Sequence, residues 1–502
     1  MVILDALWLP ITAVYAIGCT VFFCIGLNLL YLTVLAATKP VKHPAAPPLS
    51  TYPRVTVQLP IFNELYVVER LLEAACDIDW PRDRLQIQLL DDSTDETQFI
   101  SDRLVKKYAS QGVNVVHIRR PNRVGYKAGA LQEGLATAEG EFIAVFDADF
   151  VPPRNFLKET VPYFSYERVA FVQARWGHLN QSYSIFTELQ AVITDAHFLV
   201  DQVARNRGGF FMNFNGTAGV WRREAIEDAG GWEHDTLAED LDLSYRAQLK
   251  GWEAVYLPDV VAYAELPVTV TAYRRQQRRW AAGSFACALK LLPRVVRAPL
   301  APLVKIEAAL HLLGYMSHVC LLTTFLLQPF LLYYAYRAGV TSPNPTVWLV
   351  TSLPALAPVL YLIYGQWRAY GNLVRRLPYV LLASVMGAGI MLIVVGGVLK
   401  VVFARQLAFE RTPKYGIARA SDSLDGKKYV IPADSFIAIE TLFACFSLAT
   451  VTYAATLHIW GSLLYAMYFL TGLVFVVGTS IGQMAPPSLP RTLASLPGGR
   501  DL

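Results

Sequence analysis

Apolar and polar positions divide the chain into a mixed central region and two strongly apolar flanks. Residues 6–37 form one long apolar run, and five more follow at 304–336, 346–365, 378–403, 434–456 and 458–482. Each run reaches the roughly 20 residues that an α-helix needs to cross a bilayer. A secretory signal peptide has a shorter apolar region, of about 7–15 residues, after a basic start. The first run is therefore predicted to be a spanning helix rather than a signal peptide.

Between the flanks, short apolar runs alternate with helical patterns. The apolar runs lie at 55–59, 85–90, 113–118 and 142–146, and the helical patterns include 66–76 and 97–108. This alternation predicts an α/β domain with a mostly parallel, doubly wound sheet, inserted into an α-helical multi-pass membrane protein. In such sheets ligands bind beyond the carboxyl ends of the strands. Acidic residues lie at two of those ends.

Basic residues predict the orientation of the domain. Lys39 and Lys42 follow the first apolar run, so its C-terminal end, and the domain after it, should face the cytoplasm. The run 378–403 has arginines and lysines on both sides, which favours a segment that lies at the interface or re-enters the membrane. Five crossings then result, and six crossings remain the alternative.

The predicted order of segments follows from these patterns. It comprises a spanning helix at 6–37, a cytoplasmic domain at 50–270, amphipathic interfacial helices at 271–300, two spanning helices within 304–365, an interfacial or re-entrant segment and a loop at 378–430, two spanning helices within 434–482 and a tail at 483–502. We expect this protein in the cell membrane, in contact with lipids.

Composition and charge agree with a membrane protein. Hydrophobic residues make up 54% of the 502 residues and charged residues 17%, against about 25% charged residues in soluble domains. The net charge of +4 is too small to indicate nucleic-acid binding. The six cysteines include no C-x-x-C pair, so neither a disulfide framework nor a zinc site is predicted. The apolar runs contain few ionisable residues, which argues against ion-coupled transport.

Two acidic motifs follow predicted strands. Asp91 and Asp92 begin a D-D-S-T-D-E sequence, which suits either a helix cap or hydrogen bonds to a ribose or uracil. Asp147 and Asp149 follow the strand at 142–146 and project to one side if the chain stays extended. Two such carboxylates can hold a hard divalent cation together with diphosphate oxygens, although a solvated loop is an equally good interpretation.

Two further motifs lie downstream. Thr236 and Glu239 fit a capping box at a helix start, and the adjacent Asp240 would stay ionised near the positive helix end and could take a proton from a hydroxyl. Gln276, Arg279 and Trp280 share one helical face. Arginine pairs with phosphate and tryptophan stacks on sugar rings, while an interfacial helix that binds lipid headgroups is the alternative.

Taken together, the order D, D-x-D, E-D, Q-x-x-R-W resembles the membrane-bound family 2 glycosyltransferases, the group of cellulose synthase and the cellulose-synthase-like mannan and glucan synthases. The likeness covers roughly residues 50–430, with segments such as 59–64, 88–95 and 214–219 most similar to the bacterial members of the group. It implies a nucleotide-sugar-binding domain of the GT-A type. Ala238 departs from the Thr that many relatives have before the Glu-Asp pair.

The resemblance also implies roles for individual residues. Asn63, Glu64, Asp92 and Lys127 would bind the nucleotide sugar, Asp147 and Asp149 would hold Mg²⁺ or Mn²⁺, Asp240 would be the catalytic base, Gln276 and Arg279 would hold the diphosphate, Gly216, Glu239 and Trp280 would bind the acceptor, and Thr412 and Lys414 would belong to a gating loop. An ordinary basic loop is an equal alternative for the last two.

The sequence therefore predicts a processive, inverting hexosyltransferase. UDP-glucose is the expected donor, with GDP-mannose as the second choice, and the product would be a β-glycan exported through the helices, a task that could involve accessory export subunits. The alternative is a lipid glycosyltransferase that adds one sugar to a membrane lipid. A transporter or a purely structural membrane protein would leave the four motifs unexplained.

Overall fold

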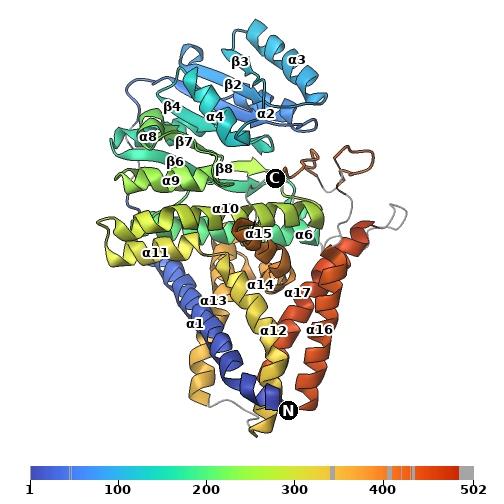
Figure 1. Cartoon of the computed structure of the whole chain (residues 1–502). Coiled ribbons are helices and arrows are strands. Elements are labelled where there is room, and N and C mark those ends of the chain that lie inside the picture. The colour runs from blue at the N-terminus through green and yellow to red at the C-terminus, as the bar shows by residue number, and fades with distance from the viewer. Residues whose placement is uncertain are drawn as a thin grey trace.

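A computed structural model describes residues 2–484 except 44–45, 47, 340–344, 404–409, 420, 430 and 432–435, and the side chains of 2–6 and 345–355 are also left out. An α/β domain lies above a group of long helices, and helices that run across the molecule separate the two (Figure 1). The tail predicted at 483–502 lies outside the described residues from 485 onward.

One eight-stranded sheet forms the centre of the α/β domain, in the order β3-β2-β1-β4-β7-β6-β8-β5. The strands are β1 (Val55–Ile61), β2 (Leu85–Asp91), β3 (Val115–Ile118), β4 (Phe142–Val145), β5 (Phe150–Val151), β6 (Val169–His178), β7 (Gly219–Arg222) and β8 (Glu253–Ala264). Strands β1 to β4 are parallel to one another, and β6 is parallel to β8. The sheet is more mixed than predicted, because β7 runs antiparallel to both β4 and β6.

Helices cover both faces of the parallel part of the sheet. Helix α2 (Val68–Cys76) and α3 (Thr97–Ser110) share one apolar core with β1, while α4 (Tyr126–Ala136) belongs to a second core that includes residues of β4. Burial on both faces explains why β4 is a continuous apolar run. The buried polar side chains of β1 and β2 are hydrogen-bonded in pairs, such as Gln58 to Gln88 at 3.0 Å. The remaining short helices of the domain are α5 (Phe156–Thr160), α8 (Arg223–Asp228) and α9 (Glu239–Leu249).

Two helical runs cross beneath the sheet (Figure 1). The first consists of α6 (Ile185–Ala196), a π-helical segment (His197–Gln202) and α7 (Val203–Gly208). The second is α10 (Val270–Arg297), which Thr269 caps by accepting a hydrogen bond from the Ala272 N–H. These runs lie where the sheet meets the lower helices, so they can line a site that opens toward both.

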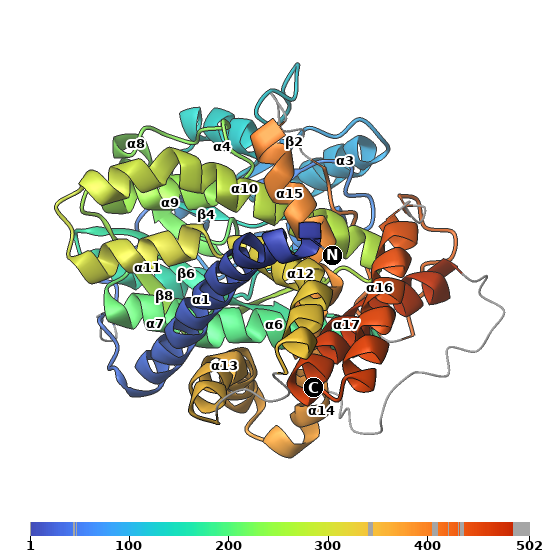
Figure 2. The same cartoon turned by 60° about the horizontal axis from the view of Figure 1, so that its bottom comes forward.

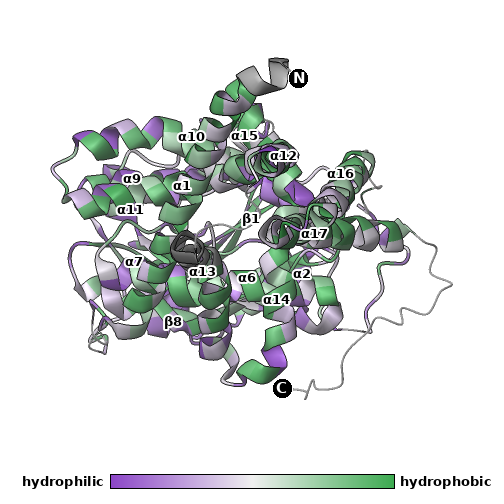
Figure 3. Ribbon diagram, turned by 90° about the horizontal axis from the view of Figure 1, so that it is seen from below, coloured by the Kyte–Doolittle hydropathy of each residue, from purple (hydrophilic) through white to green (hydrophobic). Residues whose placement is uncertain are grey.

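Figure 2 brings the lower helices to the front of the view. They are α1 (Val2–Thr38), α11 (Pro302–Leu312), α12 (Met316–Arg337), α13 (Pro345–Tyr370), α14 (Leu373–Gly389), α15 (Met391–Phe403), α16 (Phe436–Thr456) and α17 (Trp460–Met484). Among the described residues, α1, α12, α16 and α17 are long and apolar enough to cross a membrane, and apolar residues predominate along α16 and α17 in Figure 3. The chain therefore has the helices of a multi-pass membrane protein.

The predicted re-entrant segment at 378–403 is a pair of helices. Helices α14 and α15 meet at Ile390 with a bend of 42°, which suits either one broken span or a re-entrant loop. Gly389 lets α14 approach α17, since a Cβ there would lie 2.5 Å from the carbonyl oxygen of Gly472. The apolar run predicted at 304–336 is also divided, into the short α11 and the longer α12.

Candidate active site

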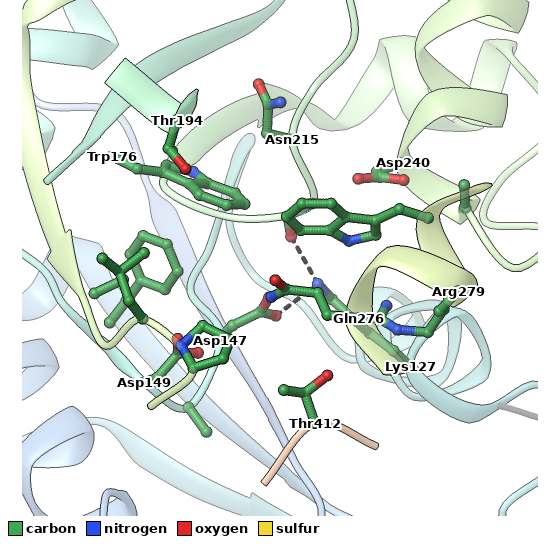
Figure 4. Close-up of a pocket in the computed structure, with 18 of the residues that line it drawn as sticks. Lys127, Asp147, Asp149, Trp176, Thr194, Asn215, Asp240, Gln276, Arg279 and Thr412 are labelled. Atoms are coloured by element: carbon green, nitrogen blue, oxygen red, sulfur yellow. Dashed lines mark hydrogen bonds and ion pairs between the residues drawn. The ribbon is translucent and has the colours of Figure 1, made fainter. Parts of the chain in front are cut away.

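A cavity of about 530 Å³ lies between the strand ends of the sheet and the two crossing helical runs. The residues predicted for the site that line it are Glu64, Asp92, Lys127, Asp147, Asp149, Gly216, Glu239, Asp240, Gln276, Arg279, Trp280, Thr412 and Lys414. They come from segments separated by up to 350 residues in sequence. Several follow strand ends, where doubly wound sheets bind their ligands. Figure 4 draws 18 of the lining residues and labels ten, with Asp147 and Asp149 on one side of the cavity and Asp240 on another.

Asn63 is the one predicted residue that is not in the cavity lining. Its backbone adopts a left-handed conformation, with φ of 57°. Its side-chain oxygen accepts a hydrogen bond of 2.8 Å from the N–H of Thr94, and its own N–H donates to Ser93 at 2.8 Å. Asn63 thus ties together the loops that follow β1 and β2, beside Glu64 and Asp92 of the cavity lining. Its contact with the nucleotide sugar stays a prediction.

Each carboxylate of the D-x-D motif contacts a lysine. Lys127 Nζ lies 2.6 Å from Asp147, and Lys414 Nζ lies 2.5 Å from Asp149. Burial raises the pKa of Asp147, and the charge of Asp149 adds to the rise, while Lys127 opposes it. Carboxylate oxygens are the ligands that Mg²⁺ and Mn²⁺ prefer. The pair therefore has suitable chemistry for a hard divalent cation, which would compete with the two ammonium groups.

A second acidic cluster lies outside the cavity. Glu233, Asp235 and Asp242 are the three acidic residues of the described chain whose carboxylate oxygens gather closely enough to hold an ion. The Lys290 ammonium already lies between 2.5 and 2.9 Å from all three. Lys290 thus neutralises part of the negative charge of this cluster, so the cluster does not by itself indicate a metal site.

Lys127 connects the two acidic groups of the cavity. Its Nζ donates a 2.8 Å hydrogen bond to the carbonyl oxygen of Gly216 and lies 3.7 Å from Glu239. Burial alone would lower the pKa of Lys127, but the charges of Asp147 and Glu239 raise it. Lys127 is therefore a fixed positive charge between the D-x-D motif and the Glu239-Asp240 pair.

Asp240 lies in the first turn of α9 and accepts a hydrogen bond of 2.8 Å from the Leu241 N–H. Burial raises its pKa to about 7, and the neighbouring charge of Glu239 contributes to the rise. Burial thus outweighs the helix-end effect, which alone would keep Asp240 fully ionised. A carboxylate with a pKa near neutrality is well matched to accept a proton from a hydroxyl.

The predicted capping box before Asp240 is not formed. Ala238 is the residue before the helix and makes no side-chain cap, while the Thr236 hydroxyl instead faces the Cys287 thiol at 3.6 Å. Packing against α10 therefore replaces the local cap. Gly216 leaves room for Asp240, because its φ of +78° is left-handed and a Cβ there would lie 2.9 Å from Asp240 Oδ2.

Gln276, Arg279 and Trp280 face the cavity from α10, as their spacing predicted. The helix is fixed to the lower helices by a fully buried ion pair between Arg274 and Glu440, with 3.0 Å between Nε and Oε1. Because charges at such a depth need partners, this pair fixes where α10 can dock. The Q-x-x-R-W face is thereby held by the membrane-spanning part of the chain.

The segment around Thr412 crosses the cavity and is held at both ends. Arg411 pairs with Glu64 at 3.2 Å, and the backbone N–H of Tyr415 donates to Glu265 at 2.9 Å. The Thr412 hydroxyl is buried and has no hydrogen-bond partner among the described residues. This segment is therefore seated over the D-x-D motif, although the gating role stays a prediction.

One wall of the cavity consists of residues that were not predicted from the sequence. Trp176 at the end of β6, Thr194 of α6, His197 of the π-helical segment and Asn215 all line it. A signal was available, since polar residues recur at helical spacing within an otherwise apolar stretch at 185–204.

Comparison with known proteins identifies relatives of the α/β domain. Residues 53–283 match the family described as "Glycosyltransferase like family 2". A probable glucomannan 4-beta-mannosyltransferase 7 of Oryza sativa subsp. japonica is 48% identical over 46% of this chain and 40% of its own length. Glucomannan 4-beta-mannosyltransferase 2 of Arabidopsis thaliana is 44% identical over 49% of this chain and 47% of its own length. This chain thus spans about half the length of these relatives.

Among solved structures, a mannosyltransferase from Pyrobaculum calidifontis in complex with GDP-Man and Mn2+ superimposes with a TM-score of 0.51. It is 22% identical, and the match covers 80% of this chain and all of that one. At this identity the likeness shows the GT-A-type fold alone. These three similar proteins come from plants and an archaeon, which gives no support to a specifically bacterial subgroup. Residues 53–283 of this chain therefore form a family 2 glycosyltransferase domain, similar to those of cellulose-synthase-like enzymes.

Proposed function

We propose that this protein transfers a mannosyl group from GDP-mannose to a growing β-glycan, with inversion at the anomeric carbon. The observation that supports this most directly is that Asp240 and the Asp147-Asp149 pair line one cavity from different sides (Figure 4). A donor diphosphate near the D-x-D motif and an acceptor hydroxyl near Asp240 would then meet inside it.

The choice of donor reverses the order expected from the motifs. UDP-glucose, predicted first, finds no support, because the similar curated proteins are named as mannosyltransferases and the similar structure holds GDP-Man. GDP-mannose, the second choice, becomes the proposed donor. The motifs alone could not identify the donor, since their residues are expected to contact the diphosphate and the reacting hydroxyl rather than the groups that distinguish one hexose from another.

Asp147 and Asp149 would hold Mg²⁺ or Mn²⁺ in this proposal. When bound, the cation neutralises charge on the departing nucleoside diphosphate. Lys127 and Arg279 supply fixed positive charge nearby from the protein itself. Preorganised charges of this kind stabilise a leaving group without having to reorganise during the reaction.

Asp240 would act as the general base. It takes the proton of the acceptor hydroxyl while that oxygen attacks the anomeric carbon, and the bond from that carbon to the phosphate oxygen breaks with its electron pair leaving on GDP. A single displacement inverts the configuration, which makes a β-linkage from an α-linked donor. Trp280 of α10 would stack on the acceptor sugar.

We further propose that the domain faces the cytoplasm of the cell membrane and that the product leaves through the lower helices. The basic residues after α1 support this orientation. Accessory export subunits would fit the same arrangement. The identity of the acceptor, a glycan or a membrane lipid, distinguishes a polymer synthase from the alternative lipid glycosyltransferase.

Product analysis with the full-length protein in detergent or nanodiscs tests this function. With labelled GDP-mannose, Mn²⁺ and a β-1,4-mannooligosaccharide, we expect a longer product that an endo-β-mannanase degrades. UDP-glucose in place of GDP-mannose should give little product. A single-sugar lipid in the organic phase, or transfer from UDP-glucose alone, would contradict the proposal.

A further inference from the structure

A histidine at the edge of the sheet lies between two carboxylates. His117 belongs to β3, the outermost strand at the end of the domain farthest from the lower helices (Figure 1). Its Nε2 lies 3.1 Å from Oδ2 of Asp91, and its Nδ1 lies 2.8 Å from Oδ1 of Asp102. A neutral imidazole has one N–H and can donate to only one of these carboxylates, whereas an imidazolium donates to both. The geometry therefore favours a positively charged His117.

The surroundings of the imidazole support the same charge. Asp91 and Asp102 come from β2 and α3, the elements that pack against β3. The Asp91 side chain is fully buried. Burial alone would raise the pKa of Asp91, but hydrogen bonds from His117 and Ser93 lower it, so this carboxylate is ionised at neutral pH. A buried anion needs a compensating charge, and His117 is the cation that contacts it among the described residues. Asp102 is exposed and also accepts from Arg119 at 3.2 Å.

Asp91 in turn fixes the loop that carries Asp92 into the cavity. Its Oδ1 accepts a hydrogen bond of 2.8 Å from the Ser93 N–H, which closes a turn directly after β2. The Ser93 hydroxyl accepts the Asn63 N–H at 2.8 Å, and this bond joins the turn to the loop after β1. Asp92 lies within the turn and lines the cavity. A continuous set of hydrogen bonds thus runs from His117 to the place where Asp92 is predicted to bind the nucleotide sugar.

We propose that His117 is a positioning residue for the donor site, and that its positive charge holds the Asp92 turn in the form that binds the nucleotide. His117 does not line the cavity, so it acts through Asp91 and the turn. Histidine is the side chain whose charge ordinarily changes between about pH 5 and 8. Loss of the His117 proton would leave Asp91 as a buried anion that faces no cation, which is unfavourable. The turn should then loosen, and donor affinity should fall as the pH rises. This assignment rests on the proposed function.

Titration of GDP in the presence of Mn²⁺, on the full-length protein in nanodiscs, measures nucleotide affinity without turnover. His117→Gln keeps an amide donor but removes the charge. We expect its GDP dissociation constant to rise by roughly tenfold at neutral pH, as for the loss of one hydrogen bond to a charged group. The KM for GDP-mannose should rise by the same factor, while kcat at saturating donor stays close to that of the unaltered protein.

A matched control separates positioning from general stabilisation. His43→Gln removes a comparable 3.0 Å contact between a buried histidine and Glu253 of β8, near the other edge of the sheet. We expect this variant to lose some thermal stability and to bind GDP like the unaltered protein.

A second variant tests the charge of His117. Arginine stays positively charged throughout this pH range and can donate to both carboxylates. The GDP affinity of the unaltered protein should fall between about pH 6 and 9, where histidine loses its proton, and that of His117→Arg should fall less. The difference between these two proteins removes the contribution of every titrating group that they share, including the nucleotide itself.

The outcomes are distinguishable. Weaker GDP binding in His117→Gln but not in His43→Gln, with a pH dependence that is reduced in His117→Arg, supports the assignment. GDP affinity in His117→Gln equal to that of the unaltered protein, even with a lower melting temperature, overturns it, and so does an equal pH dependence in His117→Arg. If His117→Gln does not fold, the pH comparison alone decides. Binding of UDP but not of GDP by the unaltered protein would instead contradict the proposed function.

Discussion

The Lys414 ammonium lies 2.5 Å from Oδ2 of Asp149 and also donates to the carbonyl oxygen of Glu265 at 3.0 Å. It comes from the segment over the cavity, whereas Asp149 follows β4, so residues 265 positions apart meet as an ion pair. A divalent cation bound by Asp149 must compete with this lysine. The charges of Asp149 and Glu265 in turn raise the pKa of Lys414 against the effect of burial, which keeps the lysine charged at neutral pH.

Removing the Lys414 charge should therefore strengthen metal binding in the absence of donor. For Lys414→Met we expect the Mn²⁺ dissociation constant to fall by roughly tenfold, which corresponds to about 1.4 kcal/mol. Electron paramagnetic resonance of free Mn²⁺ measures this directly. Lys158→Met is the control, because Lys158 forms a comparable 2.6 Å pair with Asp79 at the surface. Unchanged or weaker Mn²⁺ binding in Lys414→Met would show that Lys414 does not compete with the cation for Asp149.

The pH dependence of transfer should report Asp240. A base works only when deprotonated, so kcat/KM should be lost as the pH falls through about 7, the pKa that burial and Glu239 give to Asp240. Glu239→Gln removes the neighbouring negative charge, which lowers the pKa of Asp240 and should move the acidic limb to lower pH. A limb that stays in place, or that moves upward, would argue against Asp240 as the titrating base.

Gly216→Ala should disturb Asp240 as well as the backbone. A left-handed conformation costs a non-glycine residue roughly 1–2 kcal/mol, and the new Cβ would also lie 2.9 Å from Asp240 Oδ2. Gly112→Ala is a matched control, since Gly112 has nearly the same φ, +79°, and no atom within 4 Å of its Cβ position. Both variants should lose similar thermal stability from backbone strain, but Gly216→Ala alone should lose most of its transfer activity. Equal activity in the two variants would show that Gly216 is needed only for its backbone conformation and not for the space it leaves for Asp240.

Much of the fold could be predicted because buried strands leave a plain signal. Strand β4 is a continuous apolar run, whereas β1 and β2 alternate apolar residues with Thr or Gln, and both patterns indicate strands. Acidic residues at or just beyond the ends of β2 and β4 indicate the side of the site. The antiparallel β7 could not be predicted, because its four residues depend on pairing with two neighbours rather than on a local pattern. The GT-A-type fold is confirmed, while the exact strand directions needed the structure.

The candidate site was predictable where motifs identify chemistry and not where tertiary packing decides. Thr236 fits a capping box locally, yet its hydroxyl turns to Cys287 because α10 packs there. His197 and Asp201 were missed because a helix that is mostly buried resembles ordinary core, and only the fold shows which face borders the cavity. Lys127 and Lys414 were predicted for the site, but their ion pairs with Asp147 and Asp149 were not, since they come from α4 and from the segment near residue 414.

The most direct test of the central claim is a paired measurement on Asp240→Asn, which removes the base while nearly preserving its shape. We expect transfer of mannose from GDP-mannose to a β-mannooligosaccharide to fall by at least about 100-fold, as for loss of a general base. GDP-mannose affinity, measured by titration of the same preparation, should remain unchanged because the D-x-D pair is intact. Near-normal turnover in Asp240→Asn with normal donor binding would contradict the claim that Asp240 takes the acceptor proton.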